Sequence, residues 1–140
     1  MPRRAMLHAI SLVLFPCLVA TALAGDWPQW RGPHRDGVSE ETGLLASWNK
    51  DGPPLVWRSK GLGSGYSSVI LAKGKIFTMG SQRGGTTMTA LDLEGKPMWT
   101  TRIGGGSEPN CTPTYDDGLV YGLSKEGDFA CLDADTGEIK

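Results

Sequence analysis

Short runs of apolar and polar residues follow one another along most of this chain, and beyond Ala24 none has the period of a long helix. β-Branched and aromatic residues gather in several of these runs, each bounded by glycine, aspartate or lysine. Such runs between turn-forming residues are typical of strands. The pattern predicts strands at 68–71, 75–79, 87–91 and 97–100.

The order of strands and turns occurs twice. AKGKIF at 72–77 aligns with DDGLVY at 116–121, and TALDLEGK at 89–96 aligns with ACLDADTGE at 130–138. A repeat of about 40 to 45 residues with four short strands in each unit is typical of β-propeller blades. One blade cannot bury both of its faces alone, so each unit has to stack on neighbours.

Glycine and aspartate occupy the positions where this repeat needs turns. Gly74-Lys75 and Asp117-Gly118 are predicted to form tight turns between the first and second strand of each unit. Between the third and fourth strands, Asp92 and Asp133 can accept hydrogen bonds from the backbone that follows them, and a later glycine can take a positive φ.

The segment 1–24 has the order of a secretory signal peptide. Two arginines precede an almost wholly apolar run from Ala5 to Val19, and Ala22-Leu23-Ala24 is a small-x-small cleavage site. We therefore expect a leader helix within 1–24, cleavage before Gly25, and a periplasmic or extracellular protein. An uncleaved anchor is the alternative, although the apolar run is short for a membrane span.

Charge and cysteine content change this picture little. The chain has a net charge of −1, and loss of the two leader arginines leaves −3 on the mature part. There is no basic stripe, so we expect no nucleic-acid partner. Cys111 and Cys131 remain after cleavage; export permits a disulfide between them, but their spacing does not establish one.

Few residues could carry chemistry. A Ser-His-Asp arrangement would need His34, which lies in a Gly/Pro-rich stretch and is interpreted as a solvated loop residue. Asp133-Ala134-Asp135-Thr136-Gly137 has its glycine one position too early for a calcium loop, so we interpret it as a hairpin turn. Gly61-Leu62-Gly63-Ser64-Gly65 and Gly104-Gly105-Gly106 open no predicted helix, which favours inter-blade loops over a phosphate cradle. The sequence thus assigns no catalytic, cofactor-binding or metal-binding residue.

The five tryptophans have different predicted roles. Trp57 and Trp99 recur with the period of the repeat, which favours docking residues over a stacking platform for a ligand. Trp27 and Trp30 are expected to pin the N-terminal segment to the strands. Trp48 has no assigned role.

The repeat resembles that of the pyrroloquinoline-quinone-like (quinoprotein-type) β-propellers, roughly Ala-x-Asp-x-x-Thr-Gly-Lys-x-x-Trp. The matching residues are Ala90-Leu91-Asp92, Gly95-Lys96 and Trp99 in the first copy, and Cys131-Leu132-Asp133 and Thr136-Gly137-Glu138 in the second. DWPQWRGP at 26–33, RDGVS at 35–39, GYSS at 65–68 and TPT at 112–114 resemble a group of exported bacterial propellers with this repeat. The resemblance covers nearly all of 26–140. The first copy lacks the threonine, and Cys131 replaces the alanine of the second.

The resemblance implies an all-β fold: a partial β-propeller of four-stranded antiparallel blades, quinoprotein alcohol dehydrogenase-like, after a signal-peptide helix. The implied parts are a signal peptide at 1–24, an N-terminal segment with a propeller-closing strand at 25–57, a first blade at 58–101 and a truncated second blade at 102–140. The closing strand would end at Leu55-Val56-Trp57. In this family the docking Trp lies near the small residue of the next blade, which would make Cys131 a small buried wall.

A further strand of the second copy is expected to begin at Glu138. Family spacing from Asp133 would place the next docking Trp one position beyond Lys140. We therefore expect a fragment whose partners include the remaining propeller blades of a longer parent chain.

Two functions follow from the resemblance. The first is a non-catalytic exported binding or scaffold module with envelope proteins or polymers as partners, because the same repeat occurs in an outer-membrane assembly lipoprotein. The alternative is a quinoprotein oxidoreductase, which holds pyrroloquinoline quinone (PQQ) and calcium on the axis of eight blades and oxidises alcohols. No position in 25–140 matches a quinone or calcium ligand of that family, so PQQ and calcium are expected only in a longer parent. We favour the module, because fold does not fix function and no catalytic constellation is present.

Overall fold

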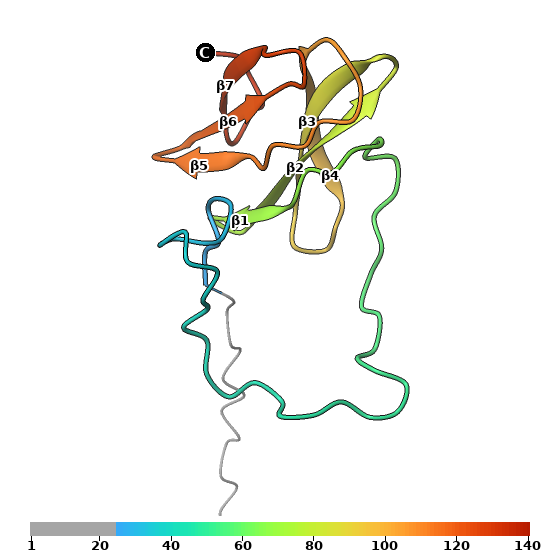
Figure 1. The fold of residues 1–140 in the computed structure, drawn as a ribbon, viewed down its shortest axis with the longest axis vertical. Coiled ribbons are helices and arrows are strands. Elements are labelled where there is room, and N and C mark those ends of the chain that lie inside the picture. The colour runs from blue at the N-terminus through green and yellow to red at the C-terminus, as the bar shows by residue number, and fades with distance from the viewer. Residues whose placement is uncertain (1–24) are drawn as a thin grey trace, which may run out of the picture.

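Residues 25–140 are described by the computed structural model of the chain, and they form an all-β fold (Figure 1). One antiparallel sheet contains β1 (Ile70–Ala72), β2 (Lys75–Gln82), β3 (Gly85–Leu91) and β4 (Pro97–Gly104), in chain order. The other contains β5 (Thr114–Asp116), β6 (Leu119–Leu123) and β7 (Phe129–Asp133), also in chain order. The predicted leader at 1–24 lies outside the described residues. In the part described, no helix is long and apolar enough to cross a membrane.

Two-residue turns with positive φ at both positions join three of the strand pairs. They are Lys73-Gly74, Arg83-Gly84 and Asp117-Gly118. This backbone matches the right-handed twist of the strands that it connects. The predicted turn at Asp117-Gly118 is confirmed. The one predicted at Gly74-Lys75 is wrong by one residue, because Lys75 already pairs with Ala72 in the ladder.

The turn between β3 and β4 is held by one carboxylate. Asp92 Oδ1 accepts hydrogen bonds from the backbone N–H groups of Glu94 (3.1 Å) and Lys96 (2.8 Å). Gly95 has φ +78°, a conformation that is sterically unfavourable for a residue with a Cβ atom. The predicted use of aspartate and glycine in this turn is therefore confirmed.

The core lies between the two sheets. One face of the first sheet carries Phe77, Met79, Met88 and Ala90, all almost completely buried. Gly122 of β6 faces them, and a Cβ atom on it would lie 2.6 Å from Met88 Cε and 2.8 Å from Met79 Sδ. The missing side chain therefore lets the two sheets approach closely. The core is completed by Ile70, Ala72, Ile103, Val120, Ala130, Leu132 and Ala134.

The second sheet follows the order of the first. β1 contacts β5, and β4 contacts both β6 and β7, so corresponding edges of the two sheets lie on the same side. Where a further strand is predicted from Glu138, the structure has a single bridge between Ile139 and Leu132.

The N-terminal segment lies along the edges of β1 and β5. Trp27 exchanges two backbone hydrogen bonds with Leu71 (2.6 and 3.1 Å), and Tyr115 N–H donates to the carbonyl of Pro28 (2.8 Å). Trp27 is half-buried there, as predicted. The prediction for Trp30 is wrong, because that residue is 60% exposed and lies beyond the bridge.

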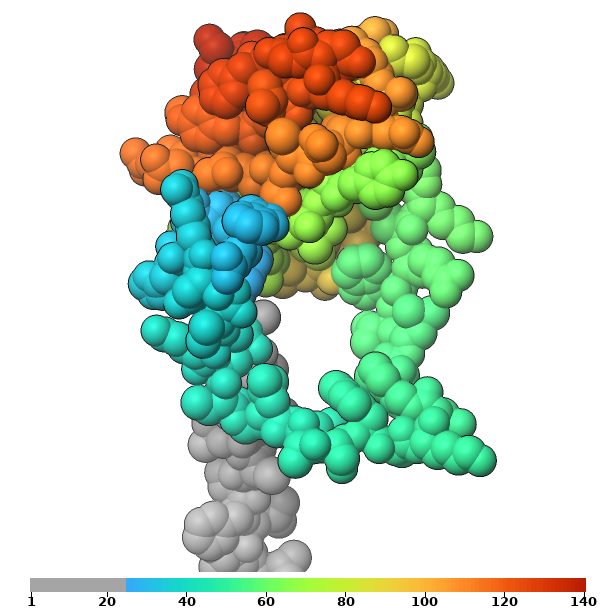
Figure 2. All heavy atoms as spheres, viewed as in Figure 1, coloured from blue at the N-terminus to red at the C-terminus, as the bar shows by residue number. Residues whose placement is uncertain are grey.

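Between Trp27 and Ser64 the chain forms no strand, and its middle stands away from the sheets as an extended strap (Figures 1 and 2). The predicted strand ending at Leu55-Val56-Trp57 is not formed in this structure. A strand needs the backbone of a partner, and no described residue pairs with this segment. That it closes a ring stays a prediction.

Candidate functional site

Trp99 fixes one sheet to the other. Its indole Nε1 donates a hydrogen bond to the carbonyl of Ala134 (3.2 Å), and Thr101 Oγ1 donates to the carbonyl of Gly137 (2.7 Å). The indole of Trp99 lies over Gly137, where an added Cβ atom would be 2.5 Å from Trp99 Cδ2. Gly137 also has φ +73°, so both its conformation and its neighbour require glycine. We call the packing of Trp99 on Gly137 the docking contact.

The same contact occurs one repeat earlier. Trp57 lies over Gly95, and a Cβ atom there would be 2.7 Å from Trp57 Cζ3. The separation in sequence from Trp57 to Trp99 equals that from Gly95 to Gly137. The predicted docking role of both tryptophans therefore has a geometric basis. Trp57 is the looser of the two: it is 40% exposed, and its indole N–H has no hydrogen bond within 25–140.

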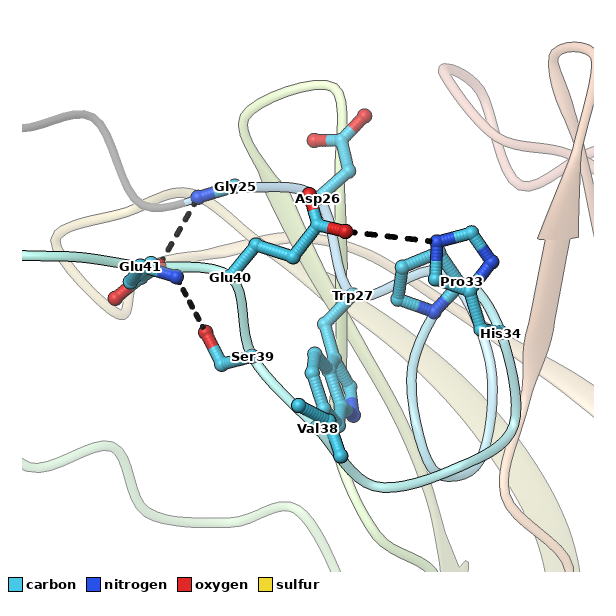
Figure 3. A pocket seen from close by; sticks show the side chains of 9 residues that line it. All are labelled: Gly25, Asp26, Trp27, Pro33, His34, Val38, Ser39, Glu40 and Glu41. Carbon is cyan, nitrogen blue, oxygen red and sulfur yellow. Dashed lines mark hydrogen bonds and ion pairs between the residues drawn. The ribbon is translucent and has the colours of Figure 1, made fainter.

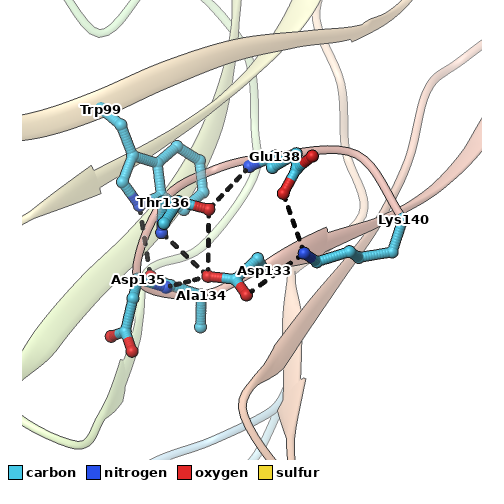
Figure 4. A network of polar contacts seen from close by, with 7 residues as sticks. All are labelled: Trp99, Asp133, Ala134, Asp135, Thr136, Glu138 and Lys140. Atoms are coloured by element: carbon cyan, nitrogen blue, oxygen red, sulfur yellow. Dashed lines mark hydrogen bonds and ion pairs between the residues drawn. The ribbon is translucent and has the colours of Figure 1, made fainter.

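The turn beneath Trp99 is held by Asp133 (Figure 4). Asp133 Oδ1 accepts from the backbone N–H groups of Asp135 and Thr136 (both 3.0 Å) and from Thr136 Oγ1 (3.1 Å). The backbone N–H of Thr136 is the main cause that lowers the pKa of Asp133 below its usual value, and Lys140 adds to it. This carboxylate serves the turn, which supports the hairpin interpretation over a calcium loop.

Three ion pairs surround this turn, one of them between Lys140 Nζ and Asp133 Oδ2 (3.6 Å). Lys75 Nζ at the start of β2 lies 2.7 Å from Asp135 Oδ1, so one charge from each sheet meets across the interface. Lys140 Nζ contacts Glu138 Oε2 (2.9 Å), and that hydrogen bond is the main cause that raises the pKa of Lys140. All three pairs have an exposed partner, so they orient the turn more than they stabilise it.

The second sheet has an apolar face that the first sheet does not cover. It carries Tyr121, Leu123, Phe129 and Cys131, and we call it the downstream face. Phe129 is 69% exposed, and its ring is stacked with that of Tyr121 at 6.1 Å between centroids. Desolvation of the Tyr121 phenol, with a smaller contribution from the nearby Cys131 thiol, raises its pKa. Cys131 is half-buried, so the predicted buried wall is open on this side.

The opposite face of the first sheet borders an apolar cavity of about 610 Å³, which we call the upstream cavity. Trp57, Leu71, Ile76, Leu91 and Leu93 contribute to its wall. By the repeat, the last three correspond to residues of the second sheet that the first sheet buries. These are Val120, Leu132 and Ala134.

His34 lies in a separate cavity of about 330 Å³ near the N-terminal segment (Figure 3). Its side chain is 67% exposed, and its Nε2 is 4.0 Å from Glu40 Oε1. Ser39 also borders this cavity, but its hydroxyl accepts a hydrogen bond from the backbone N–H of Glu41 (3.3 Å). No hydrogen bond within 25–140 joins His34 to a serine, so the geometry supports the solvated-loop interpretation.

The two glycine-rich loops each pack against a neighbouring segment. Gly105 N–H donates to Asp128 Oδ2 (2.9 Å), and Gly106 lies against the carboxylate of Glu126. Ser64, in the earlier loop, exchanges two backbone hydrogen bonds with Ser81. Two carboxylates beside the later loop would repel a phosphate, which supports an inter-sheet loop over a phosphate cradle at Gly104-Gly105-Gly106. The earlier loop precedes β1, so its placement between blades stays a prediction.

The described residues offer no metal site and no disulfide. Within 25–140 there is no group of three His, Cys, Asp or Glu side chains placed to hold a metal ion. Cys111 and Cys131 are both free thiols. No protein-family model matches the chain, and no curated protein matches it.

Proposed function

We propose that the chain belongs to an exported β-propeller with the PQQ-like repeat and works as a non-catalytic binding or scaffold module. The observation that carries this proposal is the repeated docking contact. Trp57 on Gly95 and Trp99 on Gly137 are the same pair of residue types at the same spacing: the second contact joins the two sheets, and the first joins the N-terminal segment to the first sheet. A contact that recurs with the sequence repeat is expected of wedges stacked around an axis.

The open faces support a larger ring. The downstream face and the upstream cavity are both apolar, and large exposed apolar surface marks an interaction site. In a propeller, further sheets of the same repeat cover these faces. The ring then presents its loops and outer strands to envelope proteins or polymers.

The main test is the shape of the assembled protein. Single-particle images of the purified exported protein should show rings of four-stranded wedges around a central opening. Compact particles without an opening would contradict the proposal.

Export is tested at the N-terminus. Residues 1–24 fused to a reporter that is active only after export should give reporter activity, and the mature protein should begin at Gly25. Ala24→Arg places a charge at the cleavage site, and this variant should accumulate with its leader attached. Reporter activity no higher than that of a leaderless fusion would contradict export.

The alternative, a quinoprotein oxidoreductase, needs a calcium site and a quinone pocket. Calcium takes about six to eight oxygen ligands, and residues 25–140 offer no cluster of three candidate side chains. The described residues therefore do not fit that group, and any such site would need residues from elsewhere. The purified exported protein, incubated with PQQ and calcium, should show no alcohol-dependent reduction of a dye. Turnover together with the absorbance of bound quinone would favour the oxidoreductase instead.

A further inference from the structure

The downstream face repeats a surface that is buried elsewhere in the same chain. In the first sheet, Phe77 pairs with Ala90 and Met79 pairs with Met88 across the ladder. The corresponding pairs of the second sheet are Tyr121 with Cys131 and Leu123 with Phe129. The first set is buried by the second sheet, whereas Phe129 and Leu123 are 69% and 38% exposed.

The upstream cavity is the matching half of that interface. Ile76, Leu91 and Leu93 border it, and their counterparts in the second sheet form the surface that covers Phe77 and Met88. The chain therefore carries both halves of one interface. The downstream half has no sheet across it within 25–140, and no sheet covers the upstream half, which Trp57, Arg58, Ser59 and Leu62 border and where Leu91 is 2% exposed and Leu93 46%. An established contact, the packing of the second sheet on the first, shows how the two halves fit.

We propose that the two halves meet between copies: the downstream face of one chain packs into the upstream cavity of a second copy. This rests on the proposed function, because it takes the two sheets as successive wedges, and it names the partner as a second copy of this chain. The contact is head-to-tail, so each copy keeps a free face at the opposite end. Such contacts build a closed ring if the rotation per copy divides the circle, and an open filament otherwise.

The downstream face and the upstream cavity are both largely apolar, as such an assembly requires. Leu123 and Phe129 supply apolar bulk to the downstream face, and Asp133, two residues after Cys131 in β7, places a carboxylate at one end of the same side of the sheet. The upstream cavity has a wall that is mostly apolar, and Trp57 stands at its border. Burying both surfaces removes apolar area from water on each partner.

Two charge substitutions separate the halves. Phe129→Glu places a charge on the downstream face, and Leu93→Glu places one at the upstream cavity; both positions are exposed, so neither change should unfold one chain. Leu44→Glu is the matched control, because Leu44 has the same 69% exposure as Phe129 and borders neither surface. The full chain, processed by the cell, is measured by light scattering after size exclusion.

The expected masses follow from the geometry. The wild type and Leu44→Glu should associate, with a mean mass that rises with concentration. Phe129→Glu and Leu93→Glu should each be monomeric, because each lacks one half of the contact. An equal mixture of the two should form a one-to-one dimer that grows no further, since only one intact pair of faces remains.

Three results would overturn the proposal. They are a wild-type chain that stays monomeric at every concentration, a single variant that associates as strongly as the wild type, and a mixture that stays monomeric. The near-ultraviolet circular dichroism of Leu93→Glu, which keeps every aromatic residue, reports the packing of the aromatic side chains, Trp99 in its docking contact among them. If that signal is kept while the mixture stays monomeric, self-association fails and the proposed wedge arrangement survives. If the signal is lost, both fail.

Discussion

At the scale of single residues, glycines make room for the tryptophan rings, and aspartates hold the turns in which those glycines lie. Gly137 and Gly95 are turn glycines by sequence, and that much is read from the motif. The structure adds a second requirement, because each glycine also leaves room for a tryptophan ring from another part of the chain. Asp133 bonds its own downstream backbone, as predicted, through two N–H groups, and it also accepts from the Thr136 hydroxyl.

The two requirements on Gly137 can be separated by experiment. Gly137→Ala should lose stability through its φ of +73° and through the clash with Trp99. Gly118→Ala has a similar φ, +82°, but its new Cβ atom would meet nothing within 4 Å, so it should lose only the backbone term, about 1 kcal/mol. Urea denaturation of both variants measures the difference. Equal losses would mean that Trp99 does not press on Gly137.

Asp133 should give the stability a dependence on acid pH. Its folded-state pKa lies below the usual 3.8, so its carboxylate stabilises the fold above that value, and the stabilisation is lost as the pH falls through the folded pKa. Asp133→Asn keeps an acceptor oxygen and removes the charge. The variant should be less stable than the wild type at pH 7, and the gap should narrow below about pH 4. Denaturant midpoints from pH 7 to pH 2 check this, and a constant gap would contradict it.

At the scale of elements, the strands follow the local pattern, but their ends follow their partners. β2 and β4 run beyond the predicted strands to Gln82 and Gly104 because each has a long neighbour in the ladder. Leu55-Val56-Trp57 shows the reverse: it has the residues of a strand but no partner, so it forms none in this structure. Trp57 still packs on Gly95, because that contact is made by its side chain and needs no backbone hydrogen bonds to a neighbouring strand.

The spacing of the two sheets depends on β6. Gly122→Leu should push the sheets apart and destabilise the fold by about 1–3 kcal/mol, which is typical of overpacking. Gly122→Ala should cost less, because the atoms that it would meet are the ends of flexible side chains, Met88, Met79 and Ile103. Thermal or urea denaturation of the pair ranks them. A leucine variant as stable as the alanine variant would show that the interface is looser than the structure has it.

At the scale of the whole molecule, the two sheets bury one interface between them. The downstream face and the upstream cavity, which correspond to the two halves of that interface, are not covered by a sheet. A chain that associates in its folded state gains stability with concentration, so its melting temperature should rise as the protein is concentrated. Leu93→Glu should melt at a temperature that does not depend on concentration, while Leu44→Glu should follow the wild type. Scanning calorimetry over a tenfold range of concentration checks this prediction. A sharp melt at one temperature for the wild type at every concentration would contradict it.

The sequence alone determined the four strands of the first sheet to within a few residues, most turns and the repeat, because these depend on local spacing: glycine where φ is positive, aspartate where a turn needs an acceptor, apolar residues where a strand meets a core. It also predicted a strand ending at Trp57 that the structure does not form. It also placed Trp57 and Trp99 as docking residues through their shared period. The tertiary structure decided what local spacing does not contain. It covers Met88 and exposes its counterpart Phe129, and it buries part of Trp27 while Trp30 stays exposed. Aligned residues of similar character differ in burial because burial depends on whether another part of the chain lies across them.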